Sequence, residues 1–258
     1  MPRQPHGQNF LIDNNIARKI VNAAGIKKSD LVVEIGPGKG ILTDIIKDLT
    51  HSLTLLEIDP ALSQRLSAIY AQTSNVKIEN IDALNYVFPG TPYKIVSNLP
   101  YNVGTAIVQH FLPSPSWTTA VIMLQKEVAL RLCAKPASAD YGYISIFCAY
   151  YAAAEILFDV SPSCFGPKPK VMSSVIRLTN KNAAPPDPLF FSFIKHCFSM
   201  RRKTILNCLG SFKNLDKQKA ADILATLNFD SFLRPDKLTI SDYISLTNQL
   251  KKHIILQS

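Results

Sequence analysis

Between residues 31 and 178, short runs of β-branched and apolar residues alternate with segments that have the periodicity of helices. Strands are predicted at Leu31–Ile35, Leu53–Ile58, Val76–Glu79, Ile95–Ser97 and Ala120–Leu124. Amphipathic helices, with apolar residues three and four positions apart, are predicted between them at Ile41–Leu49, Leu62–Tyr70 and Thr105–Leu112. Because strands that alternate with helices usually pair in parallel, the pattern predicts an α/β fold whose sheet is covered on both faces.

Two further strands, Phe158–Val160 and Val175–Leu178, are predicted on either side of a Pro-rich loop, and we expect them to form a final antiparallel hairpin. A polar, Pro-rich linker follows at residues 180–188. Beyond it only helices are predicted, the last with Ser241 as its N-cap, at Leu189–Ser199, Lys203–Leu209, Lys217–Leu227 and from Asp242 to about Ile255. The chain is therefore predicted to form an α/β domain, residues 1–180, and a small helical domain, residues 181–258.

The charge of the chain is unevenly distributed. The 258 residues carry 28 Lys and Arg against 19 Asp and Glu, a net charge of +9. Residues 181–258 alone hold 12 basic and 6 acidic side chains. Such a basic excess is typical of a protein with a polyanionic partner, either nucleic acid or an acidic membrane surface, and equally of a well-solvated surface.

Composition argues against several classes of protein. The longest uninterrupted apolar stretch, residues 146–154, is nine residues, whereas a membrane-spanning helix needs roughly 18. The first residues lack the apolar segment of a secretory signal. The five cysteines are scattered without a Cys-x-x-Cys pair, and the five histidines share no metal-ligand spacing. We therefore expect a cytoplasmic protein with reduced thiols, no membrane association and no metal site.

A glycine-rich segment, Glu34-Ile-Gly36-Pro-Gly38-Lys-Gly40, follows the first of these strands and opens a helix. Glycines at such a turn let the backbone approach a ligand closely, and the helix N-terminus offers free amides. The spacing differs from the G-x-G-x-x-G of dinucleotide binding. With its leading acid, it suits the methionyl end of S-adenosylmethionine better than a pyrophosphate, although a plain tight turn is the alternative.

Acidic residues follow the next two strands. Glu57 ends the second strand about 20 residues after the glycines, where a carboxylate can accept hydrogen bonds from both ribose hydroxyls of a nucleoside. Asp59 is predicted to cap the helix that begins at Pro60. Asp82, after the third strand, could accept from an adenine amino group, and taken singly it could equally be a turn residue.

The tetrapeptide Asn98-Leu99-Pro100-Tyr101 comes at the end of the fourth strand. An aromatic amine is a poor nucleophile because its lone pair is delocalised into the ring. The Asn98 side-chain oxygen and a backbone carbonyl at Leu99 or Pro100 could orient such an amine, and Tyr101 offers a ring for a flipped-out base. The tetrapeptide resembles the catalytic motif of S-adenosylmethionine-dependent methyltransferases that act on exocyclic amines of nucleic-acid bases.

Further segments narrow the resemblance: Gly7–Asp13, Met123–Ala129, Phe165–Val171 and Arg201–Thr204 are similar to the small-subunit rRNA adenine dimethyltransferases, the KsgA family of bacteria. The resemblance covers nearly the whole chain. It implies a Rossmann-like class I methyltransferase fold: a seven-stranded, mostly parallel sheet with a final antiparallel hairpin, and a small all-α C-terminal domain. It also implies dimethylation of two adjacent adenosines in the 3′-terminal hairpin loop of 16S rRNA, late in small-subunit biogenesis, by a monomer without a stable protein partner.

The resemblance assigns roles to individual residues. It implies cofactor contacts at Asn9, Leu11, Gly36, Gly38, Glu57, Asp82 and Asn98. Tyr101 and Phe165 become the pair of rings that grip the target adenine; from the residue alone, Phe165 could equally be a core anchor. Contacts with RNA are expected at Arg201, Arg202, Lys203, Lys168 and Lys170, although the first three could instead be cations at a helix C-terminus.

Two other functions stay open at this point. One is a large-subunit rRNA adenine methyltransferase of the macrolide-resistance type, whose motifs usually carry Ser in place of Pro37 and Ile in place of Leu99. The other is a non-catalytic RNA-binding assembly factor with the same fold. His6, Gly104 and Tyr143 depart from the usual pattern of the small-subunit family, which leaves the details of RNA contact open.

Overall fold

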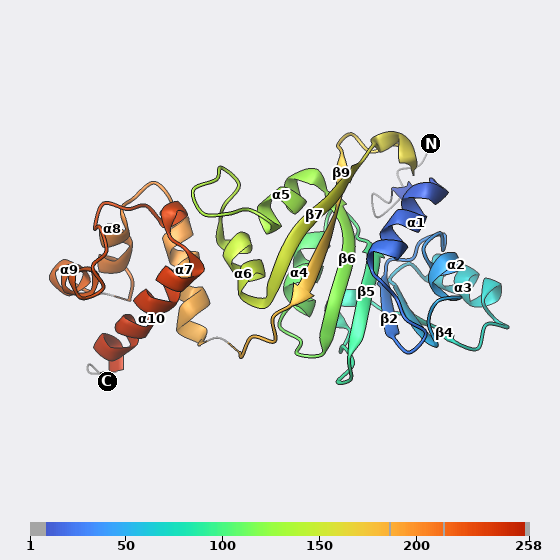
Figure 1. Ribbon diagram of the computed structural model, residues 1–258, viewed down its shortest axis with the longest axis horizontal. Helices are drawn as coiled ribbons and strands as arrows, with labels where there is room; N and C mark the ends of the chain where they lie inside the picture. Colours follow the sequence, from blue (N-terminus) through green and yellow to red (C-terminus); the bar gives the residue numbers. More distant parts are fainter. Residues whose placement is uncertain (1–8, 186, 214, 256–258) are drawn as a thin grey trace. The chain divides into compact units, whose positions relative to one another are not determined.

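The computed structural model describes residues 9–185, 187–213 and 215–255 (Figure 1). The chain divides into two compact units. One unit contains the residues up to Leu130 together with Tyr151–Asn182, and the other contains Arg131–Tyr150 and the chain from Ala183 onwards. None of the described helices is both long enough and apolar enough to cross a membrane.

The first unit is built on a seven-stranded sheet with the order β4-β3-β2-β5-β6-β9-β7. The first five strands in this order are parallel, and β9 is antiparallel to both of its neighbours, β6 and β7. The predicted mostly parallel sheet with a closing hairpin is thus confirmed. The strands are β2 Leu31–Ile35, β3 Ser52–Glu57, β4 Val76–Asn80, β5 Tyr93–Asn98, β6 Trp117–Gln125, β7 Ala152–Val160 and β9 Ser173–Asn180.

Helices connect the strands of the sheet. They are α1 Asn14–Ala23, α2 Thr43–Ile46, α3 Pro60–Ile69, α4 Gly104–Phe111, α5 Lys126–Leu132 and α6 Tyr143–Tyr151, with 3₁₀ turns at Ala83–Asn85 and Pro162–Cys164. Asp59 caps α3 as predicted, since its side chain accepts the amides of Ala61 and Leu62, and Pro60 is the first helical residue. The helix predicted at Ile41–Leu49 is shorter in the structure, where only Thr43–Ile46, helix α2, is α-helical.

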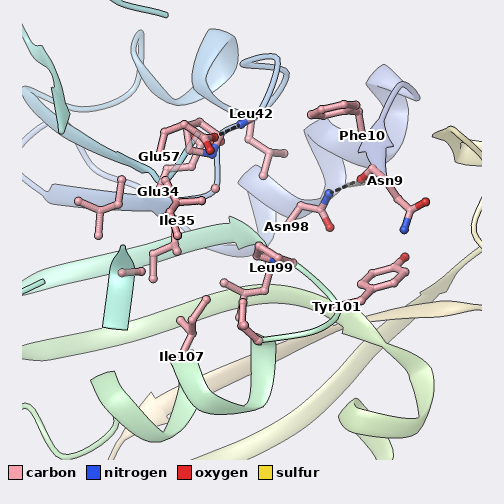
Figure 2. A pocket seen from close by; sticks show the side chains of 18 of the residues that line it. Asn9, Phe10, Glu34, Ile35, Leu42, Glu57, Asn98, Leu99, Tyr101 and Ile107 are labelled. Carbon is pink, nitrogen blue, oxygen red and sulfur yellow. Dashed lines mark hydrogen bonds between the residues drawn. The ribbon is translucent and has the colours of Figure 1, made fainter. Parts of the chain in front are cut away.

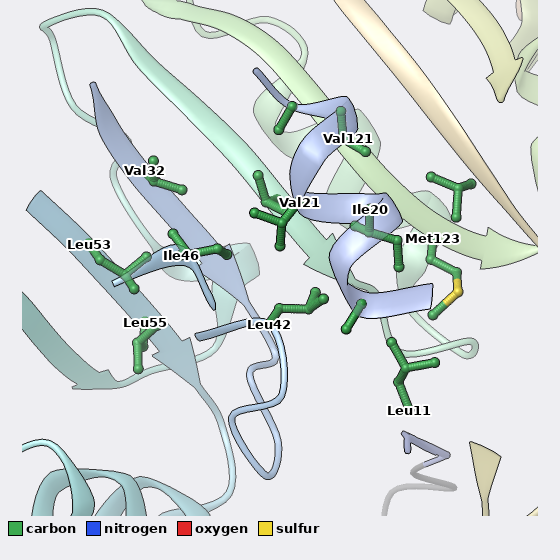
Figure 3. Packing of buried hydrophobic residues seen from close by; sticks show 14 of the residues in the cluster. Leu11, Ile20, Val21, Val32, Leu42, Ile46, Leu53, Leu55, Val121 and Met123 are labelled. Carbon is green, nitrogen blue, oxygen red and sulfur yellow. The ribbon is translucent and has the colours of Figure 1, made fainter. Parts of the chain in front are cut away.

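Helix α1 was not predicted, although its signals are present in the sequence. The Asp13 side chain accepts the amides of Asn15 and Ile16 and so caps the helix. Its buried face carries Ile20 and Val21, which pack against the sheet in the core of the unit (Figure 3). Burying this apolar face stabilises the helix more than its propensity does.

The carboxyl ends of the parallel strands carry the polar motifs found in the sequence. Strand β2 pairs with β3 on one side and with β5 on the other. The chain therefore winds outward in both directions from the β2–β5 pair, and the loops after these strands diverge there. Ligands of open α/β sheets bind in the crevice at such a switch point.

The second unit is helical around its own apolar core. Its helices are α7 Pro188–Ser199, α8 Ile205–Gly210, α9 Lys217–Thr226 and α10 Ile240–Ile255, with a 3₁₀ turn at Pro235–Lys237. The prediction that Ser241 caps the last helix was wrong. Thr239 is the capping residue: its amide and hydroxyl both donate to Asp242 Oδ2, and its Oγ1 accepts the Asp242 amide.

The division of the chain differs in one respect from the predicted boundary at residue 180. The segment Arg131–Tyr150 interrupts the first unit in sequence and belongs to the helical unit. The Tyr141 hydroxyl donates to the Leu238 carbonyl at 2.9 Å, and the Ala137 amide donates to the Asp236 carbonyl at 2.7 Å. These contacts between residues far apart in sequence leave no local signal, so a single boundary was the simplest prediction.

Candidate active site

A pocket opens at the carboxyl ends of β2, β3 and β5 (Figure 2). Its walls come from five stretches of chain that the sequence separates widely. They are residues 9–11, 34–42 without Gly40, 56–58, 81–83 and 98–103, with Ile107 from α4. Every cofactor residue expected from the sequence is in this lining, and so is the whole 98–101 tetrapeptide.

The glycine-rich segment forms the turn that the sequence predicted. Gly36, Gly38 and Gly40 all have positive φ angles, of 66°, 58° and 90°, which side-chain-bearing residues rarely adopt. The Gly36 amide donates to the Leu56 carbonyl at 2.9 Å, which fixes the loop against the end of β3. A Cβ atom on Gly38 would come within 2.9 Å of the Phe10 ring. The loop is therefore in close contact with the segment that covers it.

Glu57, at the end of β3, is only 3 % exposed. Its Oε2 accepts the Gly38 amide at 3.1 Å, and its Oε1 accepts the Asp59 amide at 3.0 Å. Burial raises the pKa of this carboxyl, while the hydrogen bonds from Asp59 and Gly38 act in the opposite direction. The residue chosen from the sequence to receive ribose hydroxyls thus lines the pocket and also supports the glycine loop.

Glu34 is a second buried acid in the pocket lining, and it was noted in the sequence only as the leading acid of the glycine motif. It is 1 % exposed, and its Oε2 accepts the Thr43 hydroxyl at 2.7 Å. Burial raises the pKa of Glu34 to about 8, the Thr43 bond lowers it, and the charges of Asp44 and Glu57 raise it further. At neutral pH the carboxyl is therefore largely protonated.

Asp82 follows β4 and has the turn role considered from the sequence, in a position that leaves the ligand role open. Its Oδ1 accepts the Leu84 amide at 2.9 Å, which caps the 3₁₀ turn at Ala83–Asn85. The half-buried residue also lies in the pocket wall with Ile81 and Ala83 on either side. A capping carboxylate has a second oxygen, which leaves acceptor capacity for a ligand.

Asn98, the last residue of β5, has an unusual hydrogen-bond environment. Its Nδ2 donates to the Asn9 carbonyl at 3.4 Å (Figure 2). Its Oδ1 is buried, and no group in the described part of the chain donates to it. A buried acceptor left without a donor costs free energy, so this oxygen is suited to a ligand that brings an N–H group.

The backbone after Asn98 is held in a tight turn. The Leu99 amide donates to the Met123 carbonyl at 3.1 Å, and the Leu99 side chain is buried. The Pro100 carbonyl accepts the Val103 amide at 3.3 Å. Of the two carbonyls considered for an incoming amine, this favours that of Leu99.

Tyr101 and Phe165 are brought together, but not as parallel rings. Their centroids are 6.5 Å apart with an angle of 68° between the planes, an edge-to-face contact. The Tyr101 hydroxyl forms a short hydrogen bond with Ser173 Oγ, and Phe165 is 3 % exposed. To hold a base between them, the two rings would have to turn toward a parallel arrangement.

A two-residue strand, β1 Phe10–Leu11, covers the pocket and was not predicted. It pairs antiparallel with β8 Phe165–Gly166, and the pairing continues with the Ile12 amide donating to the Cys164 carbonyl at 2.9 Å. Phe10 also lies under the Lys39 ammonium, 4.9 Å from the ring centroid. The segment that lines the pocket next to Gly38 is therefore joined to the one that carries Phe165.

The five residues expected to contact RNA are all exposed and lie outside the pocket. Lys168 and Lys170 lie in the loop between β8 and β9 of the first unit. Arg201, Arg202 and Lys203 follow α7 in the helical unit, where Arg201 Nη2 donates to the Ala139 carbonyl at 2.8 Å.

Two of the three departures from the family pattern have a structural setting, and His6 lies outside the described residues. Gly104 begins α4, where a Cβ would come within 2.8 Å of Leu124 Cδ2. Tyr143 begins α6 and packs on the ring of Phe191, their centroids 6.2 Å apart. Across residues 9–185, 187–213 and 215–255, no group of three or more His, Cys, Asp or Glu side chains is arranged to hold a metal ion.

The chain is similar to known proteins over almost its whole length. The family model described as ribosomal RNA adenine dimethylase matches residues 2–252. The chain is 42 % identical over 258 residues to ribosomal RNA small subunit methyltransferase A of Alkaliphilus metalliredigens, covering 95 % of this chain and 90 % of the relative. It is 39 % identical to the protein of that name from Saccharophagus degradans, covering 96 % and 94 %.

Solved structures show the same fold. A dimethyladenosine transferase from Plasmodium falciparum matches with a TM-score of 0.85 and 26 % identity, over 94 % of this chain and 98 % of that one. The 23S rRNA methyltransferase ErmE matches with a TM-score of 0.73 and 25 % identity, over 94 % and 100 %. The family model matches almost the whole length of this chain. The chain therefore belongs to the ribosomal RNA adenine dimethylase family of methyltransferases.

Proposed function

We propose that this protein transfers methyl groups from S-adenosylmethionine to the exocyclic N6 amines of two adjacent adenosines in the 3′-terminal hairpin loop of small-subunit rRNA, late in subunit assembly. The observation that carries the proposal is the buried Asn98 Oδ1 at the end of β5, an acceptor to which none of the described residues donates. The amine of an extruded adenine supplies the missing donor.

The residues of the pocket fit S-adenosylmethionine. The glycine loop lets the backbone approach a ligand, since Gly36 and Gly38 bear no Cβ and have positive φ angles. We assign Glu57 to the ribose hydroxyls and Asp82 to the adenine amino group, with Asn9 and Leu11 covering the ligand. The carboxyl group of Glu57, when ionised, favours a donor that carries positive charge. When bound, this cofactor supplies an electrophilic methyl group on a sulfonium.

The protein's own part in the reaction is to orient the amine. Asn98 Oδ1 and the carbonyl of Leu99 accept the two amine hydrogens, which favours the pyramidal nitrogen needed for attack. Pro100 limits the flexibility of the local backbone, and the Tyr101 ring provides a face for the flipped base. Phe165 is outside the pocket lining but in edge-to-face contact with Tyr101, and we assign it to the far side of the bound base. Such a site needs orientation and charge stabilisation and does not need a strong base.

Contacts outside the pocket complete the proposal. We assign Arg201, Arg202, Lys203, Lys168 and Lys170 to phosphates of the rRNA, because all five are exposed cations. The protein acts in the cytoplasm as a monomer on the assembling small subunit and needs no stable protein partner.

The residues favour this function over the two alternatives. Pro37 and Leu99 stand where the large-subunit enzymes usually have Ser and Ile. A protein that had lost catalysis would have no need to keep Glu57, Asp82 and the 98–101 tetrapeptide together in one pocket.

The test incubates the protein with S-adenosylmethionine labelled in its methyl group and with undermethylated small subunits, large subunits or free adenosine. We expect label on two adjacent adenosines near the 3′ end of the small-subunit rRNA, and none with the Asn98→Ala variant. Label on large-subunit rRNA, or on no substrate, would contradict the proposal.

A further inference from the structure

Phe232 is the most exposed large apolar residue of the described part of the helical unit. Its side chain is 79 % exposed, and the other large apolar residue exposed in this unit, Ile244, reaches 40 %. All 13 phenylalanines lie in the described residues, and the 12 others are buried or half-buried. A partner that covered this ring would gain the free energy of burying its apolar surface.

The local backbone presents the ring outward. The Asp230 Oδ1 accepts the Phe232 amide at 2.9 Å, which forms a turn just before the ring. Leu233, the next residue, packs against the core of the helical unit, while Phe232 and Arg234 are both exposed. The Leu233 amide also donates to the Asp230 carbonyl at 3.2 Å, so Phe232 lies within a closed turn, with the exposed Arg234 two residues further on.

Exposed cationic residues lie in the segments next to this ring. The Ile205 amide donates to the Leu233 carbonyl at 2.7 Å, which brings the Phe232 segment next to the exposed turn that carries Arg202 and Lys203. We call Arg202, Lys203, Phe232 and Arg234 the Phe232 surface. Arg201 is left out of it, since its guanidinium donates to the Ala139 carbonyl.

We propose that Phe232 stacks on an unpaired base of the rRNA while Arg202, Lys203 and Arg234 bind the phosphates on either side. A ring among cations matches single-stranded nucleic acid, in which every base offers a π-face and every nucleotide a negative charge. The inference rests on the proposed function, which provides the polyanion. It adds a second contact that reads unpaired RNA, in a unit that does not contain the methyl-transfer pocket.

Binding to undermethylated small ribosomal subunits tests the stacking. We expect Phe232→Ala and Phe232→Leu to weaken binding by about tenfold, the scale of losing one base–aromatic stack, and Phe232→Tyr to bind like the wild type. The dependence of affinity on salt should keep its slope in all three, whereas Arg234→Gln should lower the slope by about one. Val87→Ala is the matched control, since Val87 is 88 % exposed in the other unit.

A direct signal for stacking comes from fluorescence. The chain has one tryptophan, Trp117, which is buried in the methyltransferase unit. In Phe232→Trp, the added emission should be quenched when small subunits bind, because an indole stacked on a base loses its fluorescence. Weakened binding of Phe232→Ala without quenching of Phe232→Trp would mean a contact with a ribosomal protein and would overturn the inference.

The same experiment separates the two proposals. If wild type methylates small subunits and Phe232→Ala binds them equally well, only the stacking inference is wrong. If wild type neither binds nor methylates them, the proposed function fails first. Thermal unfolding of each variant checks that the fold is intact, which we expect at so exposed a position.

Discussion

The carboxylate of Glu57 accepts the backbone amide of Gly38 across 19 residues of sequence, at 3.1 Å. Together with the bond from the Gly36 amide to the Leu56 carbonyl, this bond ties the end of β3 to the glycine loop after β2 at one wall of the pocket. The acid expected to recognise a ribose is therefore also the group that holds the loop in shape before a ligand arrives.

Replacing Glu57 by Gln should weaken S-adenosylmethionine binding by about 10- to 100-fold, the loss expected for hydrogen bonds to a charged group. A glutamine side chain has one acceptor oxygen, whereas the two carboxylate oxygens of Glu57 each accept a hydrogen bond from a backbone amide. Calorimetric titration measures the change. Glu155→Gln, which removes an exposed carboxylate on β7, is the control; equal losses in the two variants would disprove a specific role for Glu57.

Replacing Asn98 by Ala should lower the rate of methyl transfer by at least about 100-fold, the scale of deleting one oriented polar group. The dissociation constant of the cofactor should change by less than about tenfold, because Asn98 is one of several contacts. Asn98→Asp, which keeps an acceptor, should lose less rate than Asn98→Ala. Near-normal turnover by the Ala variant, measured beside the exposed pocket-rim variant Asn102→Ala, would remove the catalytic assignment.

The Tyr101 ring and its hydroxyl can be tested apart. Tyr101→Phe and Ser173→Ala remove the same hydrogen bond, so each should lower kcat/KM by a few-fold, and the double variant should be no worse than either. Tyr101→Ala also removes the ring and should raise the KM for small subunits more than the dissociation constant of the cofactor. Equal changes in both constants would point to a purely structural role.

Gly38→Ala should destabilise the protein by about 1–2 kcal/mol, since alanine is disfavoured at a φ of 58°. The added methyl group would also press on the Phe10 ring and so weaken cofactor binding. Urea denaturation measures the first effect and calorimetry the second. Gly90→Ala is the control, because a Cβ there meets nothing within 4 Å; it should change stability by less than about 0.5 kcal/mol.

Glu34 gives stability a dependence on pH. Its pKa is about 8 in the folded state against an ordinary value of 4.5, so the folded protein binds the extra proton. Stability is then highest below the unfolded pKa and falls as pH rises toward about 8, by on the order of 2 kcal/mol between pH 6 and pH 8. Denaturation of wild type and Glu34→Gln across this range tests it: the variant's stability should be nearly flat. If the stabilities of wild type and Glu34→Gln fell equally with pH, Glu34 would not titrate between about pH 6 and pH 8.

Most of the sheet and the pocket could be predicted because their signals are local. The strand at Leu31–Ile35, the glycines after it and the polar residues at the ends of later strands each follow short-range rules, and parallel pairing brings those ends to one edge. Helix α1 had the same kind of signal, an Asp13 cap and helical spacing from Ile16 to Val21, and could have been predicted.

Other features had no local signal. The residues of α6, Tyr143–Tyr151, are apolar almost throughout, so their pattern does not distinguish a helix from a buried strand. The pairing of β1 with β8 joins two-residue strands from opposite ends of the unit. The edge-to-face contact of Tyr101 with Phe165 depends on that pairing and on Ser173, and none of these can be read from neighbouring residues.

The two-residue pairing of β1 with β8 has a consequence for chemical intervention. This pairing joins Phe10, which borders the glycine loop, to Phe165, which contacts Tyr101. A small molecule inserted between the two strands would therefore disturb the proposed cofactor site and the proposed base site at once. A compound of this kind would need neither to imitate the cofactor nor to imitate a nucleotide, and its selectivity would be set by the residues that flank the two strands.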